Sequence, residues 1–210
     1  MSIADLRREY TCDGLSERDA GGDPLALFRR WFEAAVAAEL PLANAMTLAT
    51  VTPEGTADAR VVLLKDFEAG DFVFYTHTRS PKGRQLAANP SACAVFFWAE
   101  LERQVRIWGR VEPVSDRDAD AYFASRPLGA RLSAWASAQS EPVRDRAVLE
   151  RALEATRRRW GENPPRPPHW SGYRLRPEAI EFWQGRENRL HDRLRYTRGN
   201  GSWTIERLAP

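Results

Sequence analysis

The sequence predicts a mainly β fold of the α+β class, with helices at the periphery of a small antiparallel barrel or sandwich. Three observations support this prediction. Residues 45–113 carry five short runs rich in Val, Phe and Thr that are punctuated by turn residues. Helical spacing of apolar residues is found mostly before and after these runs. Strand-like runs return after residue 168 and are expected to complete the same sheet system, which favours a single domain.

Length and composition fit one globular domain. A chain of 210 residues with 43% hydrophobic and 29% charged side chains can bury a sizeable core without disulfides or a metal. Cys12 and Cys93 form neither a disulfide framework nor a zinc motif, so no metal is expected. The N-terminus lacks the apolar core of a secretory signal, and no run approaches the roughly 20 residues of a membrane helix. We therefore expect a cytoplasmic protein without membrane contact.

The first half of the chain is predicted in order as follows. Residues 1–22 are polar and contain three glycines, so they are expected to form a flexible arm ahead of a domain over residues 23–210. Asp23-Pro24 has the form of an N-cap followed by proline, and it predicts a helix over 24–40. Strands are predicted at 45–51, 57–66, 72–77, 92–99 and 104–113, with a short helix at 80–89.

The second half is helical before it returns to strands. Helices are predicted at 116–125, 130–138 and 142–160, and the four prolines within residues 163–168 predict a stiff connector. Strands are predicted at 172–175, 179–183, 193–197 and 202–208, the last two joined by a hairpin loop at 198–201.

Charge is distributed unevenly along the chain. Residues 1–143 carry 16 basic and 20 acidic side chains, whereas residues 144–210 carry 15 and 9. A basic C-terminal third is typical of a site for an anionic ligand or a nucleic acid, and equally of a solvated surface. Only Lys65 and Lys82 among the 31 basic residues are lysines. Because lysine is a compact point charge and arginine a planar fork, these two positions are candidates for a specific role.

Three cationic clusters could hold a phosphate, since the sequence has no glycine-rich phosphate loop. The first is RVVLLK at residues 60–65. Strict alternation along a strand would place Arg60 and Lys65 on opposite faces. Either the strand bends or Lys65 lies past its end at the mouth of a cleft. The pattern alone favours an ordinary strand with charged ends.

The second cluster joins Tyr75-Thr76, at the end of a predicted strand, to Ser80-Pro81-Lys82 at the start of a helix. Free N–H groups at a helix N-terminus attract anions, although Ser80 could equally be a simple N-cap.

The third cluster is RLHDR at residues 189–193. If it is extended, Arg189, His191 and Arg193 share one face, and the two cations should lower the pKa of the histidine. Such a trio suits a phosphate or a flavin ring better than a metal, and a purely structural histidine is about equally compatible.

Other signals are weaker or negative. Tyr122 and Arg126 are four residues apart on one predicted helix and share a face, and Gln104 shares a strand face with Arg106 and Trp108. No nucleophile elbow is present, and the three histidines have no metal-ligand spacing. Neither a helix-turn-helix nor an aromatic stacking motif is evident, so we expect no nucleic-acid binding.

Taken together, short strings spread over residues 6–210 resemble the pyridoxamine 5'-phosphate oxidase family. Each string is weak alone, but their order along the chain is specific. They are LRREY at 6–10, RVVLLK at 60–65, VFYT at 73–76, ERQV at 102–105, the segment 122–127, QS at 139–140, EFWQG at 181–185, RLHDR at 189–193 and RLAP at 207–210.

The resemblance implies an FMN-binding split β-barrel that works as a homodimer, with FMN at the subunit interface. It implies oxidation of pyridoxamine 5'-phosphate and pyridoxine 5'-phosphate to pyridoxal 5'-phosphate. Molecular oxygen would reoxidise the flavin and yield hydrogen peroxide, and the amine substrate would also release ammonia. In this reading the cofactor supplies the redox chemistry while the protein positions the reactants.

The resemblance also implies site residues, position by position. Cofactor contacts would be Arg60, Val61, Lys65, Tyr75, Thr76, Lys82, Gln104, Gln139, Ser140, Trp183 and Arg193. Substrate contacts would be Lys65, Tyr122, Arg126, Ala130, Arg189 and His191, with Arg7 and Tyr10 closing over the site as a lid. Arg189 and His191 are the candidate catalytic residues, which would orient the substrate ring and stabilise charge as hydride leaves. Both lysines of the chain belong to this set.

Two positions depart from the family pattern. Pro81 stands where the family usually has an arginine on the flavin phosphate, and Ala130 where it usually has a serine on the substrate phosphate. We therefore expect weaker retention of FMN and weaker substrate binding without loss of activity. The alternatives are an FMN oxidase of the same fold acting on another substrate, such as a phenazine precursor, and a non-catalytic binder of FMN or pyridoxal phosphate.

Overall fold

The computed structural model describes residues 2–3, 9–10 and 14–210, and its strands form one antiparallel sheet. The strands are β1 (Ala45–Val51), β2 (Ala57–Leu63), β3 (Phe72–His77), β4 (Ser91–Trp98), β5 (Arg103–Pro113), β6 (Trp170–Gln184), β7 (Asp192–Arg198) and β8 (Trp203–Arg207). Their order is β2-β1-β4-β5-β6-β7-β8, and β3 also pairs with β6. This arrangement confirms the predicted mainly β, α+β class.

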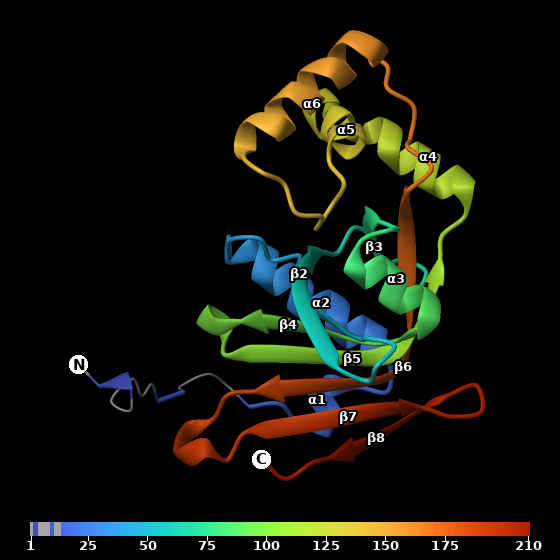
Figure 1. The fold of residues 1–210 in the computed structure, drawn as a ribbon. Coiled ribbons are helices and arrows are strands. Elements are labelled where there is room, and N and C mark those ends of the chain that lie inside the picture. The colour runs from blue at the N-terminus through green and yellow to red at the C-terminus, as the bar shows by residue number, and fades with distance from the viewer. Residues whose placement is uncertain (1, 4–8, 11–13) are drawn as a thin grey trace.

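The long strand β6 makes the fold a split barrel. Its first half pairs with β3 and its second half with β7, while β5 runs along the opposite edge. A bridge between Asp66 and Val73 brings β3 back to the chain that leaves β2, which closes the ring. Strands β7 and β8 remain outside as a ribbon, seen at the bottom of Figure 1.

Helix α2 (Pro24–Ala37) covers the core on one side of the barrel. Asp23 caps it by accepting a hydrogen bond from the Leu25 amide at 2.9 Å, and Pro24 stands in its first turn. Phe28, which is fully buried, contacts the rings of Phe72 and Phe96 at 4.8 and 5.2 Å between centroids. The helix therefore stays in place through aromatic packing rather than through helix propensity alone.

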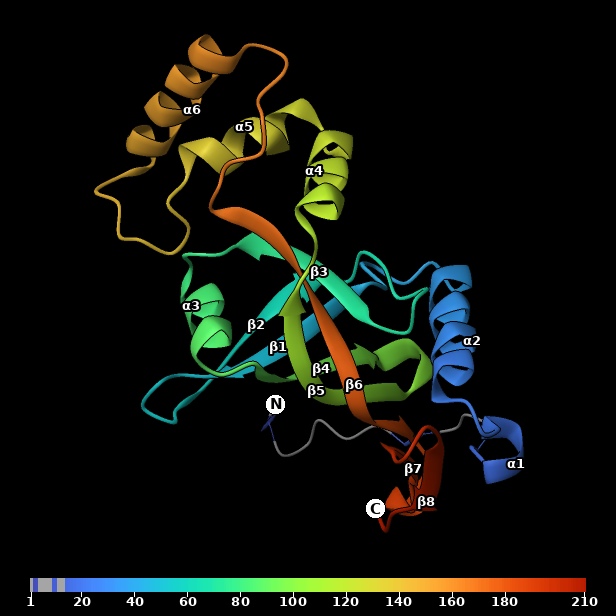
Figure 2. The same ribbon diagram turned by 90° about the vertical axis from the view of Figure 1, so that its right-hand side faces the viewer.

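The remaining helices are α1 (Glu17–Ala20), α3 (Pro81–Ala88), α4 (Asp116–Ser125), α5 (Leu128–Ala136) and α6 (Arg146–Trp160), with 3₁₀ turns at Ala99–Leu101 and Glu187–Arg189. Ser80, Ser115 and Asp145 cap α3, α4 and α6 by accepting backbone N–H groups. Figures 1 and 2 both show α4, α5 and α6 grouped beyond one end of the barrel, opposite the β7–β8 ribbon.

The fold departs from the sequence predictions at β6. The strands predicted at 172–175 and 179–183 are one continuous strand that includes Pro177. A register shift between Trp108 and Gly109 places Gly109 opposite Pro177, so the missing proline N–H falls at the irregularity. A Cβ on Gly109 would lie 1.8 Å from the Arg176 carbonyl oxygen, so only glycine fits there.

Residues 1–22 were predicted to form a flexible arm, but the last part of this segment is ordered and packed. Leu15 and Ala20 are buried, and Ser16 caps the short helix α1. The arm is thus packed against the domain from residue 14 onward. Arg7 lies outside the described residues, whereas Tyr10 lies within them. Within the part of the chain that the structure describes, no helix is long and apolar enough to cross a membrane.

Candidate functional site

A cavity of about 680 Å³ brings together nine of the residues predicted from the resemblance. These are Arg60, Val61, Lys65, Tyr75, Thr76, Lys82, Tyr122, Arg126 and Gln139. The other lining residues are Val62, Leu63, His77, Pro127, Ser133, Ala134, Ser137 and Trp170. Among these lining residues are two arginines and two lysines and no carboxylate, so the cavity fits an anionic ligand.

Lys65 reaches the same cavity as Arg60 because strand β2 ends between them. The last residue of β2 is Leu63, and the Lys65 amide donates a hydrogen bond to the Val73 carbonyl at 2.8 Å. The alternation of the strand no longer applies past that point. Of the two arrangements considered for residues 60–65, the one with Lys65 past the strand end is the one observed.

The start of α3 and the loop after α5 meet at Gln139. Its amide oxygen accepts hydrogen bonds from Thr76 Oγ1 at 3.2 Å and from Lys82 Nζ at 3.0 Å. Burial, followed by the charge of Arg60, lowers the pKa of Lys82. Two cations therefore face one region of the cavity. Ser140, the next residue, is exposed with φ of 71° and is absent from the described lining.

Aromatic rings form one wall of the cavity. Tyr75 stacks on Tyr122 with 3.9 Å between centroids and lies 5.3 Å from Trp170. Gly172 stands opposite Tyr75 in the β3–β6 register, and a Cβ there would lie 2.6 Å from the Tyr75 ring. Burial raises the pKa of Tyr75, so its hydroxyl is neutral and able to donate a hydrogen bond at neutral pH.

Arg126 follows α4 and enters the cavity over the face of Trp170, with 4.7 Å from the guanidinium carbon to the ring centroid. Its Nη1 is buried without a hydrogen-bond partner, and burial lowers its pKa. A buried unpaired guanidinium nitrogen is costly unless an anion occupies the space beside it. Ala130 is half-buried on α5 and is absent from the described lining, whereas Ser133, one turn later, is part of it.

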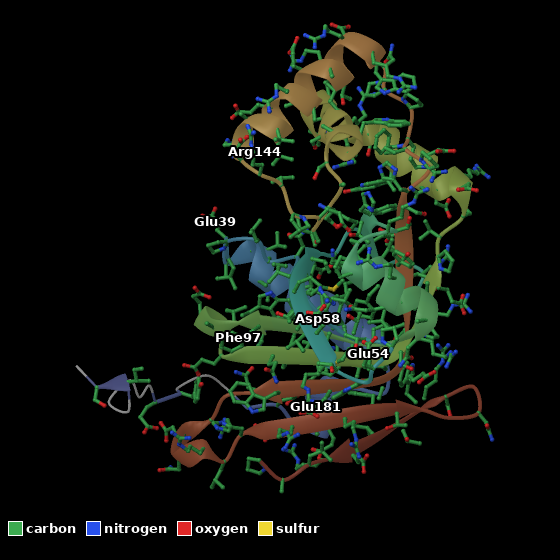
Figure 3. The ribbon with its side chains drawn as sticks, in the orientation of Figure 1. Glu39, Glu54, Asp58, Phe97, Arg144 and Glu181 are labelled. Atoms are coloured by element: carbon green, nitrogen blue, oxygen red, sulfur yellow. The ribbon has the colours of Figure 1, made fainter. Side chains whose placement is uncertain are left out.

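A second group of predicted residues forms a row across three strands. Gln104 on β5 is paired with Trp183 on β6, and Trp183 is paired with Arg193 on β7. Glu181, labelled in Figure 3, is 3% exposed and accepts a hydrogen bond from Arg193 Nε at 3.0 Å. The ion pair also brings Arg193 Nη2 to 2.9 Å from the same carboxylate oxygen. Arg193 Nη1 donates to the Ala209 carbonyl at 2.8 Å. The guanidinium is thus held on two sides.

Tyr10 and His191 stand beside this row. The Tyr10 ring meets Trp183 and His191 edge-on, at 5.5 and 5.4 Å between centroids. His191 Nδ1 accepts a hydrogen bond from the Arg186 amide at 3.1 Å, which leaves the proton of the neutral ring on Nε2. Burial, followed by the charge of Arg189, lowers the pKa of His191. The predicted direction of this pKa shift is confirmed. Arg193 is not among its causes, and its guanidinium forms an ion pair with Glu181.

Arg189 does not share a strand face with His191 and Arg193. Asn188 and Arg189 have φ of 55° and 60°, and β7 begins only at Asp192. The extended arrangement considered for residues 189–193 is therefore wrong at its first residue. Two successive non-glycine residues in the left-handed region are strained, and such strain is often found at functional sites.

Several residues at these two groups were missed by sequence reasoning. Trp170, Ser133 and Ser137 line the cavity, and Glu181 holds Arg193. Trp170 stands at the first position of β6 and Trp183 near its last, so the cavity and the row lie toward opposite ends of one strand. In the described residues, the cavity lining contains none of the row residues.

Comparison with known proteins identifies relatives over the full chain. Residues 32–160 match the family described as pyridoxamine 5'-phosphate oxidase, and residues 170–210 match the pyridoxine 5'-phosphate oxidase C-terminal dimerisation region. The chain is 57% identical over 209 residues to a pyridoxine/pyridoxamine 5'-phosphate oxidase from Cupriavidus pinatubonensis, with 99% of each chain covered. It is 56% identical over 212 residues to one from Burkholderia lata, covering 100% of this chain and 99% of that one.

Two solved structures share the fold. PhzG from Burkholderia lata, in complex with tetrahydrophenazine-1-carboxylic acid, has a TM-score of 0.90 and 31% identity over 97% of this chain and 100% of its own. A pyridoxamine 5'-phosphate oxidase-related, FMN binding protein from Nostoc punctiforme has a TM-score of 0.71 and 21% identity, over 87% of this chain and 97% of that chain. The second likeness bears on the fold alone.

Proposed function

The chain belongs to the pyridoxamine 5'-phosphate oxidase family, and we propose that it oxidises pyridoxamine and pyridoxine 5'-phosphates to pyridoxal 5'-phosphate with FMN as cofactor. The observation that carries the substrate assignment is Arg126 Nη1, a buried cationic nitrogen without a partner. It lies beside Tyr122 and faces the same cavity as Lys65. Two cations and a phenol form a natural site for the phosphate of the substrate.

The donor set of the cavity also fits FMN. Arg60 and Lys82 would hold its phosphate, because both line the cavity and the charge of Arg60 lowers the pKa of Lys82, an effect that a bound dianion would offset. Thr76 and the Gln139 amide would supply further hydrogen bonds. When bound, the flavin would accept hydride from the substrate and pass electrons to O2, which yields hydrogen peroxide.

We infer that a complete site requires two chains. The cavity and the Gln104–Trp183–Arg193 row lie toward opposite ends of β6, so one chain does not bring them together. Trp183, His191 and Arg193 fall within residues 170–210, which match the dimerisation region of the family, whereas Gln104 precedes that region. Val61 at the cavity and Phe97, paired with Gln104, are 64% and 60% exposed (Phe97 is labelled in Figure 3). Exposed apolar side chains at both groups suit coverage by a partner chain.

In such a dimer each half has its own task. The cavity of one chain holds both phosphates and places the reacting carbon, so binding energy is used away from the bond that breaks. The partner contributes His191, whose ring is neutral and donates from Nε2, together with Arg189 as a fixed positive charge. These two groups would orient the substrate ring for the loss of hydride, His191 as a hydrogen-bond donor and Arg189 as a cation beside polar ring substituents. Tyr10, already packed on Trp183 and His191, excludes water from the same space.

The alternative substrate class is a phenazine precursor. It is favoured by one observation, the 31% identity and TM-score of 0.90 with PhzG. With FMN bound, Arg60 and Lys82 would pair with the phosphate of the cofactor, which leaves Lys65 and Arg126 for the substrate. A phenazine precursor has no phosphate to place beside these two cations. The phosphate substrates are therefore the better fit to Lys65, Tyr122 and Arg126.

An anaerobic spectrum of the FMN-loaded protein tests the proposal. Addition of pyridoxamine 5'-phosphate should bleach the flavin bands while one equivalent of pyridoxal phosphate and ammonia forms. Admission of air should restore the bands, yield hydrogen peroxide and allow further turnover. Bands that persist with both phosphate substrates would contradict the proposed reaction. Bleaching by tetrahydrophenazine-1-carboxylic acid under the same conditions would then support the alternative.

A further inference from the structure

A buried hydrogen-bond network lies behind Arg60 and has no role in the reaction described above. Thr50 on β1 and Gln85 on α3 are 1% and 6% exposed. Thr50 Oγ1 accepts a hydrogen bond from Arg60 Nη1 and donates one to Gln85 Oε1, both at 2.6 Å. Gln85 Oε1 also accepts from Arg60 Nη2 at 3.2 Å. Gln85 Nε2 donates to the Asp58 carboxylate at 2.9 Å.

The donors and acceptors of this network fit together in one arrangement. Arg60 can only donate, so the proton between Thr50 and Gln85 must come from the threonine hydroxyl. The amide oxygen of Gln85 then faces two donors, and its NH2 group faces a carboxylate. Turning the amide over would oppose like groups on both sides. The hydrogen bond from Gln85, and then the charge of Arg60, hold the pKa of Asp58 below its usual range.

We propose that Thr50 and Gln85 are positioning residues that hold Arg60 in the orientation needed to receive the phosphate of FMN. This inference rests on the function proposed above. The Arg60 guanidinium contacts three elements. It donates hydrogen bonds to Thr50 on β1 and to Gln85 on α3, and it forms an ion pair with Asp58 on β2. Asp58, labelled in Figure 3, is on the strand that also carries Arg60.

The network also fixes the separation of the two cations. Gln85 stands three residues after Lys82 on α3, so the hydrogen bonds that tie Gln85 to the sheet tie the Lys82 end of the helix to it as well. A preorganised pair of cations receives a dianion without losing side-chain freedom at the moment of binding. Loss of the Thr50 hydroxyl leaves Arg60 in the chain but removes this preorganisation.

Two substitutions at one position separate the hydroxyl from the shape of the side chain. Thr50→Val keeps the shape and removes the hydroxyl, while Thr50→Ser keeps the hydroxyl. Each apoprotein is titrated with FMN and with riboflavin, which lacks the phosphate, by quenching of flavin fluorescence. Thr50→Val should raise the Kd for FMN about tenfold and change that for riboflavin less than about twofold. Thr50→Ser should bind both flavins like the parent, as should Thr156→Val, which removes a buried hydroxyl on α6.

A double-mutant cycle tests whether the effect passes through Arg60. In an Arg60→Ala background, Thr50→Val should change the Kd for FMN no further, because the group that it positions is gone. Gln85→Met should behave like Thr50→Val, and unchanged melting temperatures of the apoproteins would exclude general unfolding as the cause.

The outcomes distinguish the proposed function from the positioning role of Thr50 and Gln85. A parent apoprotein that binds no FMN would overturn the proposed function together with this inference. A parent that binds FMN, with a Thr50→Val variant that binds it equally tightly, would overturn the positioning role alone. Equal losses of FMN and riboflavin, or a full Thr50→Val effect without Arg60, would also overturn it.

Discussion

Glu181 forms an ion pair with Arg193 across the β6–β7 pair and accepts a hydrogen bond from its Nε, and the Glu181 side chain is almost completely buried. This carboxylate and the Ala209 carbonyl, which accepts a hydrogen bond from Arg193 Nη1, together hold the guanidinium next to Trp183. Arg106 lies on the other side of the same carboxylate at 3.7 Å. Glu181 is therefore a structural support for one half of the proposed site.

Glu181→Gln should weaken both the fold and the site. The amide keeps the shape but loses the charge, so we expect a loss of stability of about 1–3 kcal/mol and weaker FMN binding. Thermal unfolding and flavin titration measure the two effects. Glu178→Gln, on an exposed position of the same strand, is the matched control and should be neutral. Parent-like behaviour of Glu181→Gln in both assays would refute the support role.

Arg126→Leu should act on the phosphate of the substrate. We expect KM for pyridoxamine 5'-phosphate to rise at least about tenfold, with a smaller change in kcat, because the lost contact is remote from the reacting carbon. Steady-state kinetics with pyridoxamine 5'-phosphate and with pyridoxamine separate the effects, since only the first substrate has the phosphate. Arg117→Leu, on an exposed position of α4, serves as control. An equal loss for both substrates would contradict this assignment.

Pro81→Arg should strengthen FMN binding by supplying a cation next to Lys82 at the start of α3. A hydrogen bond to a charged group contributes about 1.5–3 kcal/mol, so the Kd should fall at least about tenfold. Titration of the apoprotein gives the value directly. Pro81→Ala separates the gain of the arginine from the loss of the proline. No gain in affinity with Pro81→Arg would show that this position does not reach the flavin phosphate.

Gly172→Ala should disturb the aromatic wall. Its Cβ would lie 2.6 Å from the Tyr75 ring and 2.8 Å from Val114, so the ring must shift in the cavity. We expect destabilisation of about 1–3 kcal/mol together with weaker flavin binding. Gly129→Ala on α5 meets open space and should be neutral or slightly stabilising. Chemical denaturation of both variants provides the comparison, and equal stability of the two would rule out the predicted clash.

The pH dependence of stability should include a contribution from Glu17. Hydrogen bonds from Arg207 lower the pKa of this carboxyl from 4.5 to about 2. Because the folded pKa is the lower one, the stabilisation is present above pH 4.5 and is lost as the pH falls toward 2. Melting temperatures between pH 6 and pH 2 should therefore fall less steeply for Glu17→Gln than for the parent. Parallel curves would show that the pair does not contribute.

The sequence predicted individual helices better than features that depend on contacts between distant segments. Period and capping signals located α2, α3 and α4 within a few residues, because Asp23, Ser80 and Ser115 act through local hydrogen bonds. Two strands were predicted, one on either side of Pro177, whereas the structure has the single strand β6. A proline is tolerated inside this strand because Gly109 lies opposite it at the register shift with β5, which the local sequence does not indicate. Contacts between distant segments leave no local pattern.

The same distinction applies to the site. The resemblance named nine residues that the fold brings into one cavity, and composition independently singled out both lysines among them. The supports of these residues were not predictable. Gln85 and Thr50 are 35 positions apart, and Glu181 meets Arg193 only across a sheet. The left-handed backbone at Arg189 was also missed, since neither residue type nor spacing indicated it.

The length of β6 has a genetic consequence if the proposed dimer is correct. Each strand begins at the cavity of one site and ends in the row that completes the other, so both sites of a mixed dimer are assembled from two alleles. A chain damaged in its cavity and a chain damaged in its row would then complement each other. Their mixed dimer contains one centre with both defects and one with neither, so two inactive gene copies could together sustain the cell.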